Sequence, residues 1–237
     1  MRFLADFKLP RSGHFFAAQS EKKRRLLPLL LQTAILFTVF TGTLRAEDID
    51  GATFSQDDLE AKLTYCKTCH GLSAQGFRGY SAMPRLAGQR TEYLENQLRA
   101  FVERRRDNKF MFGVASALSP AMVTALVTHL KDLNPKPLGG APREMVAAGK
   151  KLYEEGVPGA NIPPCSSCHG PEARGIGAAP RLAGQLSEYT SKTLTNWSNE
   201  RGRDPTKPDT SAIMEPIARG LTGSQIAAVA AYLNYLE

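Results

Sequence analysis

The sequence predicts an all-α protein built from two tandem copies of one small helical unit. The segment Pro-Arg-Leu-Ala-Gly-Gln occurs twice, as residues 84–89 and 180–185, at an offset of 96 residues. Apolar residues also recur at helical spacing near the end of each half. They are Val123, Leu126, Val127 and Leu130 in the first half and Ile226, Val229, Ala230 and Leu233 in the second. A repeat of about 100 residues is too long for a solenoid and suits two small domains.

Composition and charge indicate a globular chain and argue against a nucleic-acid partner. Of the 237 residues, 42% are apolar and 22% are charged. The formal net charge is +7, but residues 1–46 contribute 8 Lys/Arg and 2 Asp/Glu, so the remainder is nearly neutral. A phosphate-binding face needs clustered basic residues on the folded domain. The only dense cluster there, Arg104–Arg106, is interpreted as a solvated helix end.

Residues 1–46 are predicted to be a signal peptide or an N-terminal anchor. Basic residues 22–25 precede a 15-residue, mainly apolar run at 26–40. This length matches the apolar core of a signal peptide and is shorter than the roughly 20 residues of a spanning helix. Cleavage is predicted after Ala46. The alternative is an uncleaved anchor that associates the protein with a membrane, and in both cases the remaining chain is exported.

The predicted domains cover residues 47–137 and 138–237. The segment 134–142 contains three prolines and two glycines, which marks it as the linker. Each half is predicted to begin with a helix, at about Asp57–Thr64 and Pro142–Glu154.

Later helices in each half are predicted from matching start signals. Second helices begin near Thr91 and Leu186. The final helix of the first half begins at Ser119, because Pro120 suits the first helical position. Its counterpart begins at Thr222, with Gln225 completing a capping box.

All four cysteines fall in two C-x-x-C-H pentapeptides, Cys66–His70 and Cys165–His169. This motif is the attachment signature of a c-type haem. Two thiols add across two vinyl groups of one porphyrin edge, and the adjoining histidine supplies an axial nitrogen to the iron. The sequence therefore predicts two covalently bound haems c. The predicted attachment residues are Cys66, Cys69, Cys165 and Cys168, and the predicted axial ligands are His70 and His169.

Three other interpretations of the cysteines are open. One zinc site could use both cysteine pairs, but it would leave the histidine after each pair unexplained. Structural disulfides occur in exported proteins, yet a bridge closing a two-residue loop is strained and redox-active. A thioredoxin-like motif would need a surrounding βαβ pattern, which the sequence lacks.

The second axial ligands are predicted to be Met111 and Met214. These methionines occupy equivalent repeat positions, each eight residues before the Ser or Thr that caps the final helix. Thioether ligation of haem iron is well established. Met122 is interpreted as core filler, and Met83 has no counterpart in the second half. His129 is the only histidine of residues 47–237 outside the two motifs, so both haems cannot have two histidine ligands.

Ligation by His and Met closes both axial positions and favours outer-sphere electron transfer over chemistry at the iron. No catalytic residues are predicted, because the sequence shows no paired carboxylates, Ser-His-Asp set or phosphate loop.

Taken together, these motifs resemble the dihaem cytochrome c4 family of two-domain class I c-type cytochromes. The resemblance covers roughly residues 57–237 and rests on two C-x-x-C-H halves, each followed by the repeated Pro-Arg-Leu-Ala-Gly-Gln segment, a Tyr-containing helix, a Met loop and a capped final helix. It implies two cytochrome c-like domains and a periplasmic electron carrier. Such carriers pass electrons from a bc1-type complex to terminal oxidases. It also implies that the carbonyls of Pro84 and Pro180 orient His70 and His169. The alternative for these prolines is simple turn punctuation.

The two halves differ at two places. The final helix of the first half has His129 where the second half has Tyr232, and residues 198–210 lengthen the second Met loop.

The leading alternative function is the cytochrome subunit of a periplasmic dehydrogenase complex. An enzyme such as a dihaem peroxidase is disfavoured, because it would need one labile or absent axial ligand.

Overall fold

The computed structural model describes residues 54–201 and 210–237, so the predicted signal peptide or anchor lies outside the described residues. Its first half contains the helices α1 (Gln56–His70), α2 (Thr91–Val102), α3 (Lys109–Ser116) and α4 (Pro120–Asp132). Two short antiparallel strands, β1 (Phe77–Arg78) and β2 (Ala82–Met83), pair Phe77 with Met83.

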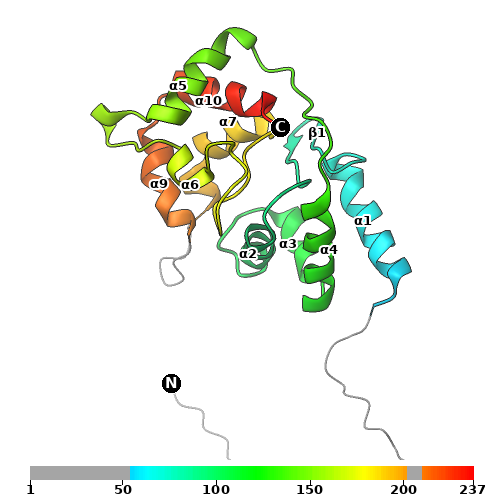
Figure 1. Cartoon of the computed structure of the whole chain (residues 1–237). Coiled ribbons are helices and arrows are strands. Elements are labelled where there is room, and N and C mark those ends of the chain that lie inside the picture. The colour runs from blue at the N-terminus through cyan, green and yellow to red at the C-terminus, as the bar shows by residue number, and fades with distance from the viewer. Residues whose placement is uncertain (1–53, 202–209) are drawn as a thin grey trace, which may run out of the picture. The chain divides into compact units, whose positions relative to one another are not determined.

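The second half contains more and shorter helices. These are α5 (Val146–Glu155), α6 (Ser166–His169), α7 (Ser187–Thr195), α8 (Trp197–Glu200), α9 (Ser211–Gly220) and α10 (Gly223–Tyr235), with 3₁₀ turns η1 (Arg143–Met145) and η2 (Pro158–Ala160). In Figure 1, α1–α4 form one group of helices and α5–α10 another. The predicted all-α fold is confirmed.

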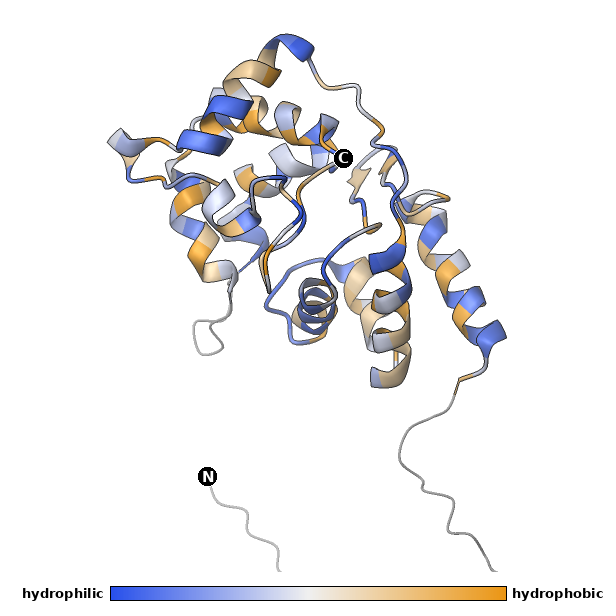
Figure 2. Cartoon of the chain, viewed as in Figure 1, coloured by the Kyte–Doolittle hydropathy of each residue, from blue (hydrophilic) through white to orange (hydrophobic). Residues whose placement is uncertain are grey.

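Helix α1 is longer than the predicted Asp57–Thr64 and contains the whole first C-x-x-C-H motif. Ser55 caps its N-terminus in a capping box with Asp58. Hydrophilic and hydrophobic residues alternate along it (Figure 2), and Leu63 is buried. The helix ends at Gly71, whose φ of 88° is readily adopted only by glycine. The motif histidine therefore occupies the last position of a regular helix.

The second motif is separated from the helix that precedes it. Helix α5 ends at Gly156, where φ is 70° and an added Cβ would lie 2.3 Å from the carbonyl oxygen of Ile162. A tight loop follows, in which Val157 and Ile162 form a β-bridge. The motif then has its own short helix, α6. The prediction of a helix over Pro142–Glu154 is correct for α5, but its first residues form a 3₁₀ turn.

The predicted starts of the final helices are confirmed. Ser119 caps α4 by accepting a hydrogen bond from the backbone N–H of Met122, and Pro120 is the first helical residue. Thr222 caps α10 in a capping box with Gln225. These signals act within four residues of the cap, so they operate independently of the tertiary structure.

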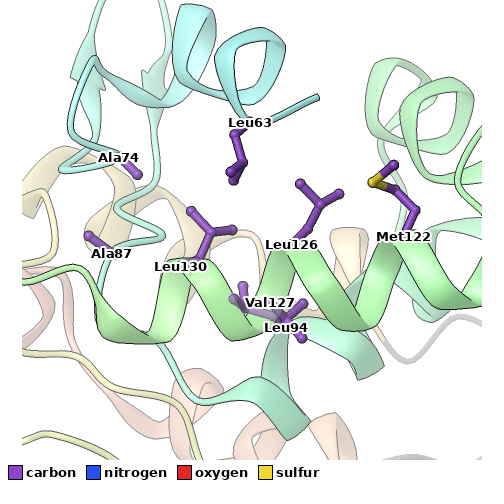
Figure 3. Packing of buried hydrophobic residues seen from close by; sticks show 8 residues of the cluster. All are labelled: Leu63, Ala74, Ala87, Leu94, Met122, Leu126, Val127 and Leu130. Carbon is purple, nitrogen blue, oxygen red and sulfur yellow. The ribbon is translucent and has the colours of Figure 1, made fainter. Parts of the chain in front are cut away.

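Two hydrophobic cores contain most of the predicted apolar stripes or pack against them, whereas Ile226 and Ala230 are buried outside both cores. The first core surrounds α4 and contains Leu63, Ala74, Ala87, Leu94, Met122, Leu126, Val127 and Leu130 (Figure 3). The second contains Leu152, Tyr153, Ala173, Ala183, Val229, Tyr232 and Leu233. Met122 is buried in the first core, as predicted.

Both cores belong to one compact unit, Asp48–Glu237. The domain boundary at residue 137 therefore stays a prediction. None of the helices among the described residues is long and apolar enough to span a membrane alone. By length and composition only, α3 and α4 would qualify as a pair bent by 112°.

Candidate haem-binding sites

The first motif places His70 in a position suited to ligating a metal through one ring nitrogen. His70 is buried, and its Nδ1 lies 2.9 Å from the carbonyl oxygen of Pro84. A carbonyl only accepts, so Nδ1 carries the proton and Nε2 keeps its lone pair. Burial, and then the nearby charge of Arg106, lower the pKa of His70. The imidazole is therefore kept in the neutral form that binds iron.

The second motif repeats this arrangement. His169 is buried at the end of α6, and its Nδ1 lies 3.0 Å from the carbonyl oxygen of Pro180. Burial again lowers the pKa of the imidazole. The hydrogen bonds that the resemblance implied for Pro84 and Pro180 are thus present. Their role in orienting iron ligands stays a prediction.

The four cysteines are all free thiols in the structure. Burial raises the pKa of Cys66 and of Cys165. Redox-active cysteines have a lowered pKa instead, so this environment does not favour a thioredoxin-like role. Cys165 packs against the second core, whereas α1 contributes Leu63 to the first. The two pairs are therefore held by different cores, which disfavours one shared zinc site. Two separate thiol pairs, each beside a buried neutral imidazole, fit covalent haem.

Met111 and Met214 occupy short helices rather than the predicted Met loops. Met111 lies in the first turn of α3, where its N–H donates to the side chain of Asn108, and it is half-buried. Met214 lies in α9, which contains Pro216, and is also half-buried. The backbone at both methionines is therefore helical. Each methionine lies eight residues before the residue that caps the final helix of its half. Iron ligation by these methionines stays a prediction.

His129 and its repeat counterpart, Tyr232, differ in their exposure to solvent. His129 is exposed on α4. Tyr232 is buried in α10, with its ring centroid 5.5 Å from that of Tyr153. The hydroxyl of Tyr153 in turn donates to the carbonyl of Gly170, next to the second motif. A tyrosine pair therefore packs beside the second motif, whereas the His129 side chain of the first half is exposed.

The repeated hexapeptides bind each other through their glutamines. The backbone N–H of Arg85 donates to Gln185 Oε1 at 2.8 Å, and Gln185 Nε2 donates to the carbonyl of Arg85 at 3.2 Å. Gln89 makes the same two bonds to Arg181, at 2.7 and 2.9 Å. Arg85 directly follows Pro84, whose carbonyl is the hydrogen-bond partner of His70. The glutamine of the second half therefore binds the first half right beside this proline, and the same holds with the halves exchanged. Sequence reasoning missed this role, although the identical recurrence of the glutamine was the signal for it.

The arginines of the hexapeptides are buried and bind the linker. Both Arg85 and Arg181 direct a guanidinium nitrogen to Asn134 Oδ1, at 3.3 and 3.4 Å. Arg85 also donates to the carbonyl of Pro135 at 2.9 Å. Burial, and then the charge of Arg181, lower the pKa of Arg85 to about 10. The linker therefore supplies oxygen acceptors to two buried cations.

Replacing Gln185 with alanine is expected to lower the free energy of unfolding by about 2 kcal/mol or more, because a buried N–H and a buried carbonyl of Arg85 lose their partner. Gln89→Ala should act similarly at Arg181. Chemical denaturation of the holoprotein, followed by haem absorbance, measures the change. Gln56→Ala is the control, since Gln56 is exposed and should stay within about 0.5 kcal/mol of the wild type. Equal stability of the Gln185 and Gln56 variants would contradict the expectation.

The interpretation of Arg104–Arg106 as a solvated helix end is wrong for two of the three arginines. Arg105 is buried and bonds Glu103 at 2.7 Å, and Arg106 is half-buried. Only Arg104 is exposed, with its guanidinium 3.7 Å from the ring centroid of Phe112. The backbone of Arg106 pairs with that of Arg201 in an isolated β-bridge, which draws the segment into the fold. Most of the predicted 198–210 expansion lies outside the described residues.

Comparison with known proteins identifies clear relatives. The cytochrome c family model matches residues 146–237. Cytochrome c-552 of Acidithiobacillus ferridurans is 36% identical over 177 residues, which cover 72% of this chain and 73% of that protein. The thiosulfate dehydrogenase electron acceptor of Thiomonas intermedia is 37% identical over 172 residues, covering 71% and 76%. Cytochrome c4 of Thiocapsa roseopersicina is 37% identical over 177 residues, covering 73% and 87%.

Solved structures agree with these relatives. The cytochrome c4 structure from Acidithiobacillus ferrooxidans superposes with a TM-score of 0.59 at 35% identity, covering 72% of this chain and 98% of that one. Reduced cytochrome c4 from Pseudomonas stutzeri gives a TM-score of 0.65 at 26% identity, covering 78% and 100%.

Proposed function

Because this chain belongs to the dihaem cytochrome c4 family, we propose that it binds two haems c and shuttles electrons between redox proteins in the periplasm. The chain has the class I cytochrome c fold and is an electron carrier with covalent haem, not an enzyme. The single observation that carries the two-haem proposal is the duplicated site. In each half, a thiol pair adjoins a buried histidine whose Nδ1 is held by a proline carbonyl.

In each site, the cysteines and the histidine would bind different parts of the haem. The thiols of Cys66 and Cys69, and of Cys165 and Cys168, would form the two thioether bonds. His70 and His169 would ligate iron through Nε2, since Nδ1 is already engaged. Bound haem would supply a reversible one-electron couple at iron.

Met111 and Met214 are proposed as the opposite ligands. A thioether there would raise the reduction potential relative to a second histidine and leave no open position for substrate. Electrons would then pass by outer-sphere transfer, in which no bond forms or breaks.

A spectroelectrochemical titration of the purified mature holoprotein tests this function. We expect two low-spin haems per chain, both at positive potential and both showing the far-red iron–methionine band. A single haem per chain would contradict the two-haem proposal. A high-spin or low-potential haem would show that one methionine is not a ligand and would reopen the enzyme interpretation.

The proposed partners are a bc1-type complex as donor and a terminal oxidase as acceptor. A second candidate donor is a periplasmic dehydrogenase, favoured by the relative named as a thiosulfate dehydrogenase electron acceptor. Redox encounters of this kind use small, transient interfaces. Stopped-flow reduction by each purified donor separates the candidates. Rapid reduction by thiosulfate dehydrogenase, with slow reduction by the bc1-type complex, would favour the second donor, and the reverse would favour the first.

A further inference from the structure

One peptide group in the first half lies between the motif histidine and a glutamine of the second half. This group joins Pro84 to Arg85. Its carbonyl oxygen accepts from His70 Nδ1 at 2.9 Å, and its N–H donates to Gln185 Oε1 at 2.8 Å. The two hydrogen bonds therefore use opposite ends of the same amide.

The second half repeats this arrangement with the halves exchanged. The peptide group here joins Pro180 to Arg181. Its carbonyl oxygen accepts from His169 Nδ1 at 3.0 Å, and its N–H donates to Gln89 Oε1 at 2.7 Å. Each glutamine is thus linked to the motif histidine of the other half through one peptide group.

Neighbouring backbone groups fix the orientation of each glutamine amide. Gln185 Oε1 also accepts from the N–H of Leu186 at 3.0 Å, while Gln185 Nε2 donates to the carbonyl of Arg85. A flipped amide would direct its NH₂ group at two N–H donors, so the oxygen must face the N–H of Arg85. Gln89 Oε1 likewise accepts from the N–H of Arg90 at 2.9 Å.

These hydrogen bonds lie in a buried and closely packed region. Both glutamines are buried, as are Arg85 and Arg181. A Cβ added at Gly184 would lie 3.2 Å from Arg85 Nη1, which shows how closely the two hexapeptides approach. In such a setting hydrogen bonds are electrostatically stronger than in water, and consecutive bonds polarise one another.

Polarisation of the peptide group reaches the histidine ring. An acceptor on the N–H shifts electron density through the amide to its carbonyl oxygen, which becomes a stronger acceptor. A stronger acceptor at Nδ1–H makes Nε2 of the imidazole a more basic ligand for a metal. Because a more basic ligand stabilises oxidised iron more than reduced iron, it lowers the reduction potential.

We propose that Gln185 lowers the reduction potential of the haem ligated by His70, and that Gln89 has the same role for the haem ligated by His169. Each glutamine is a positioning residue, since it acts through a peptide group and a histidine. Each half would then set part of the potential of the haem in the other half. This inference rests on the proposed ligation of haem iron by the two motif histidines.

The test uses holoproteins with Gln185→Met and Gln89→Met, which keep the length of the side chain and remove its hydrogen-bonding groups. Gln56→Met is the control, because Gln56 is exposed. Haem content and low-spin spectra are measured first. A wild-type chain with fewer than two low-spin haems would contradict the proposed function itself. The two midpoint potentials are then measured, together with the NMR signals of both histidine Nδ1–H protons in the reduced protein.

In Gln185→Met, the potential of the first haem is expected to rise. At a fixed applied potential its ratio of reduced to oxidised haem should increase about threefold or more. The Nδ1–H signal of His70 should move upfield because its hydrogen bond weakens, while the second haem changes less. Gln89→Met should change the second haem and the His169 signal instead, and Gln56→Met should change neither.

Gln185→Glu keeps an acceptor beside the peptide group and tests the direction of the effect. An ionised carboxylate accepts a hydrogen bond more strongly than an amide. The potential of the first haem should therefore fall, and the His70 signal should move downfield. A general loosening of the contact between the halves would not produce shifts of opposite sign in the two Gln185 variants.

Three results would overturn the proposal. The first is wild-type potentials in Gln185→Met and Gln89→Met holoproteins that retain both haems. The second is an equal shift of both haems in each variant, which would indicate loosening of the contact between the halves. The third applies if Gln185→Met yields no folded holoprotein, and is an unchanged or raised potential of the first haem in Gln185→Glu.

Discussion

Replacing Met111 with leucine is expected to convert one haem to a high-spin or ligand-exchanged state, while the other haem keeps its spectrum. Leucine preserves the size of the side chain and the helix, but it has no sulfur to donate to iron. The far-red iron–methionine band should fall to about half. The potential of the affected haem should drop by on the order of 0.1 V, within the roughly 0.8 V range that axial ligands span. Met214→Leu should affect the other haem in the same way.

The structure supplies a matched control for this experiment. Met122 is buried in the first core, close in sequence to Met111, and is predicted to be filler. Met122→Leu is a volume-conserving change that costs less than about 1.5 kcal/mol and should leave the spectrum unchanged. An unaltered far-red band in Met111→Leu would show that Met111 is not a ligand.

Replacing Gly149 with alanine is expected to destabilise the second half of the chain severely. Gly149 lies in α5. Helix α5 packs against α10 (Figure 1). A Cβ at this position would lie 2.0 Å from the carbonyl oxygen of Ala228 and 2.8 Å from the Cβ of Tyr232. Backbone atoms cannot yield as a flexible side chain can, so the two helices must separate. This separation would disrupt the second core.

We expect a loss of about 3 kcal/mol or more in the free energy of unfolding, at the upper end of overpacking effects. Chemical denaturation of the holoprotein and the yield of folded protein both report the loss. Gly223→Ala is the control, because Gly223 begins α10 and no atom lies within 4 Å of an added Cβ. If Gly149→Ala were as stable as the Gly223 variant, the close packing of α5 on α10 would be contradicted.

The local features of this protein follow from short stretches of sequence. The spacing within C-x-x-C-H predicts haem attachment because the two thiols and the histidine must meet one porphyrin, which five consecutive residues arrange by themselves. The caps at Ser119 and Thr222 are equally local, since each hydroxyl binds a backbone N–H three residues later. The cores were predictable for a similar reason, because apolar periodicity marks the buried face of a helix wherever that helix packs.

Contacts between the halves depended on the tertiary structure. The repeat identified the hexapeptides, but nothing in one hexapeptide indicates that Gln185 binds the backbone of Arg85, 100 residues away. The basic run Arg104–Arg106 is a second case in which local sequence did not predict the environment of the side chains. Charge patterning predicts solvation for all three arginines, whereas Arg106 is half-buried and pairs with the buried Arg201. Local chemistry acts through covalent spacing, while these hydrogen bonds and charges form only when folding brings distant segments into contact.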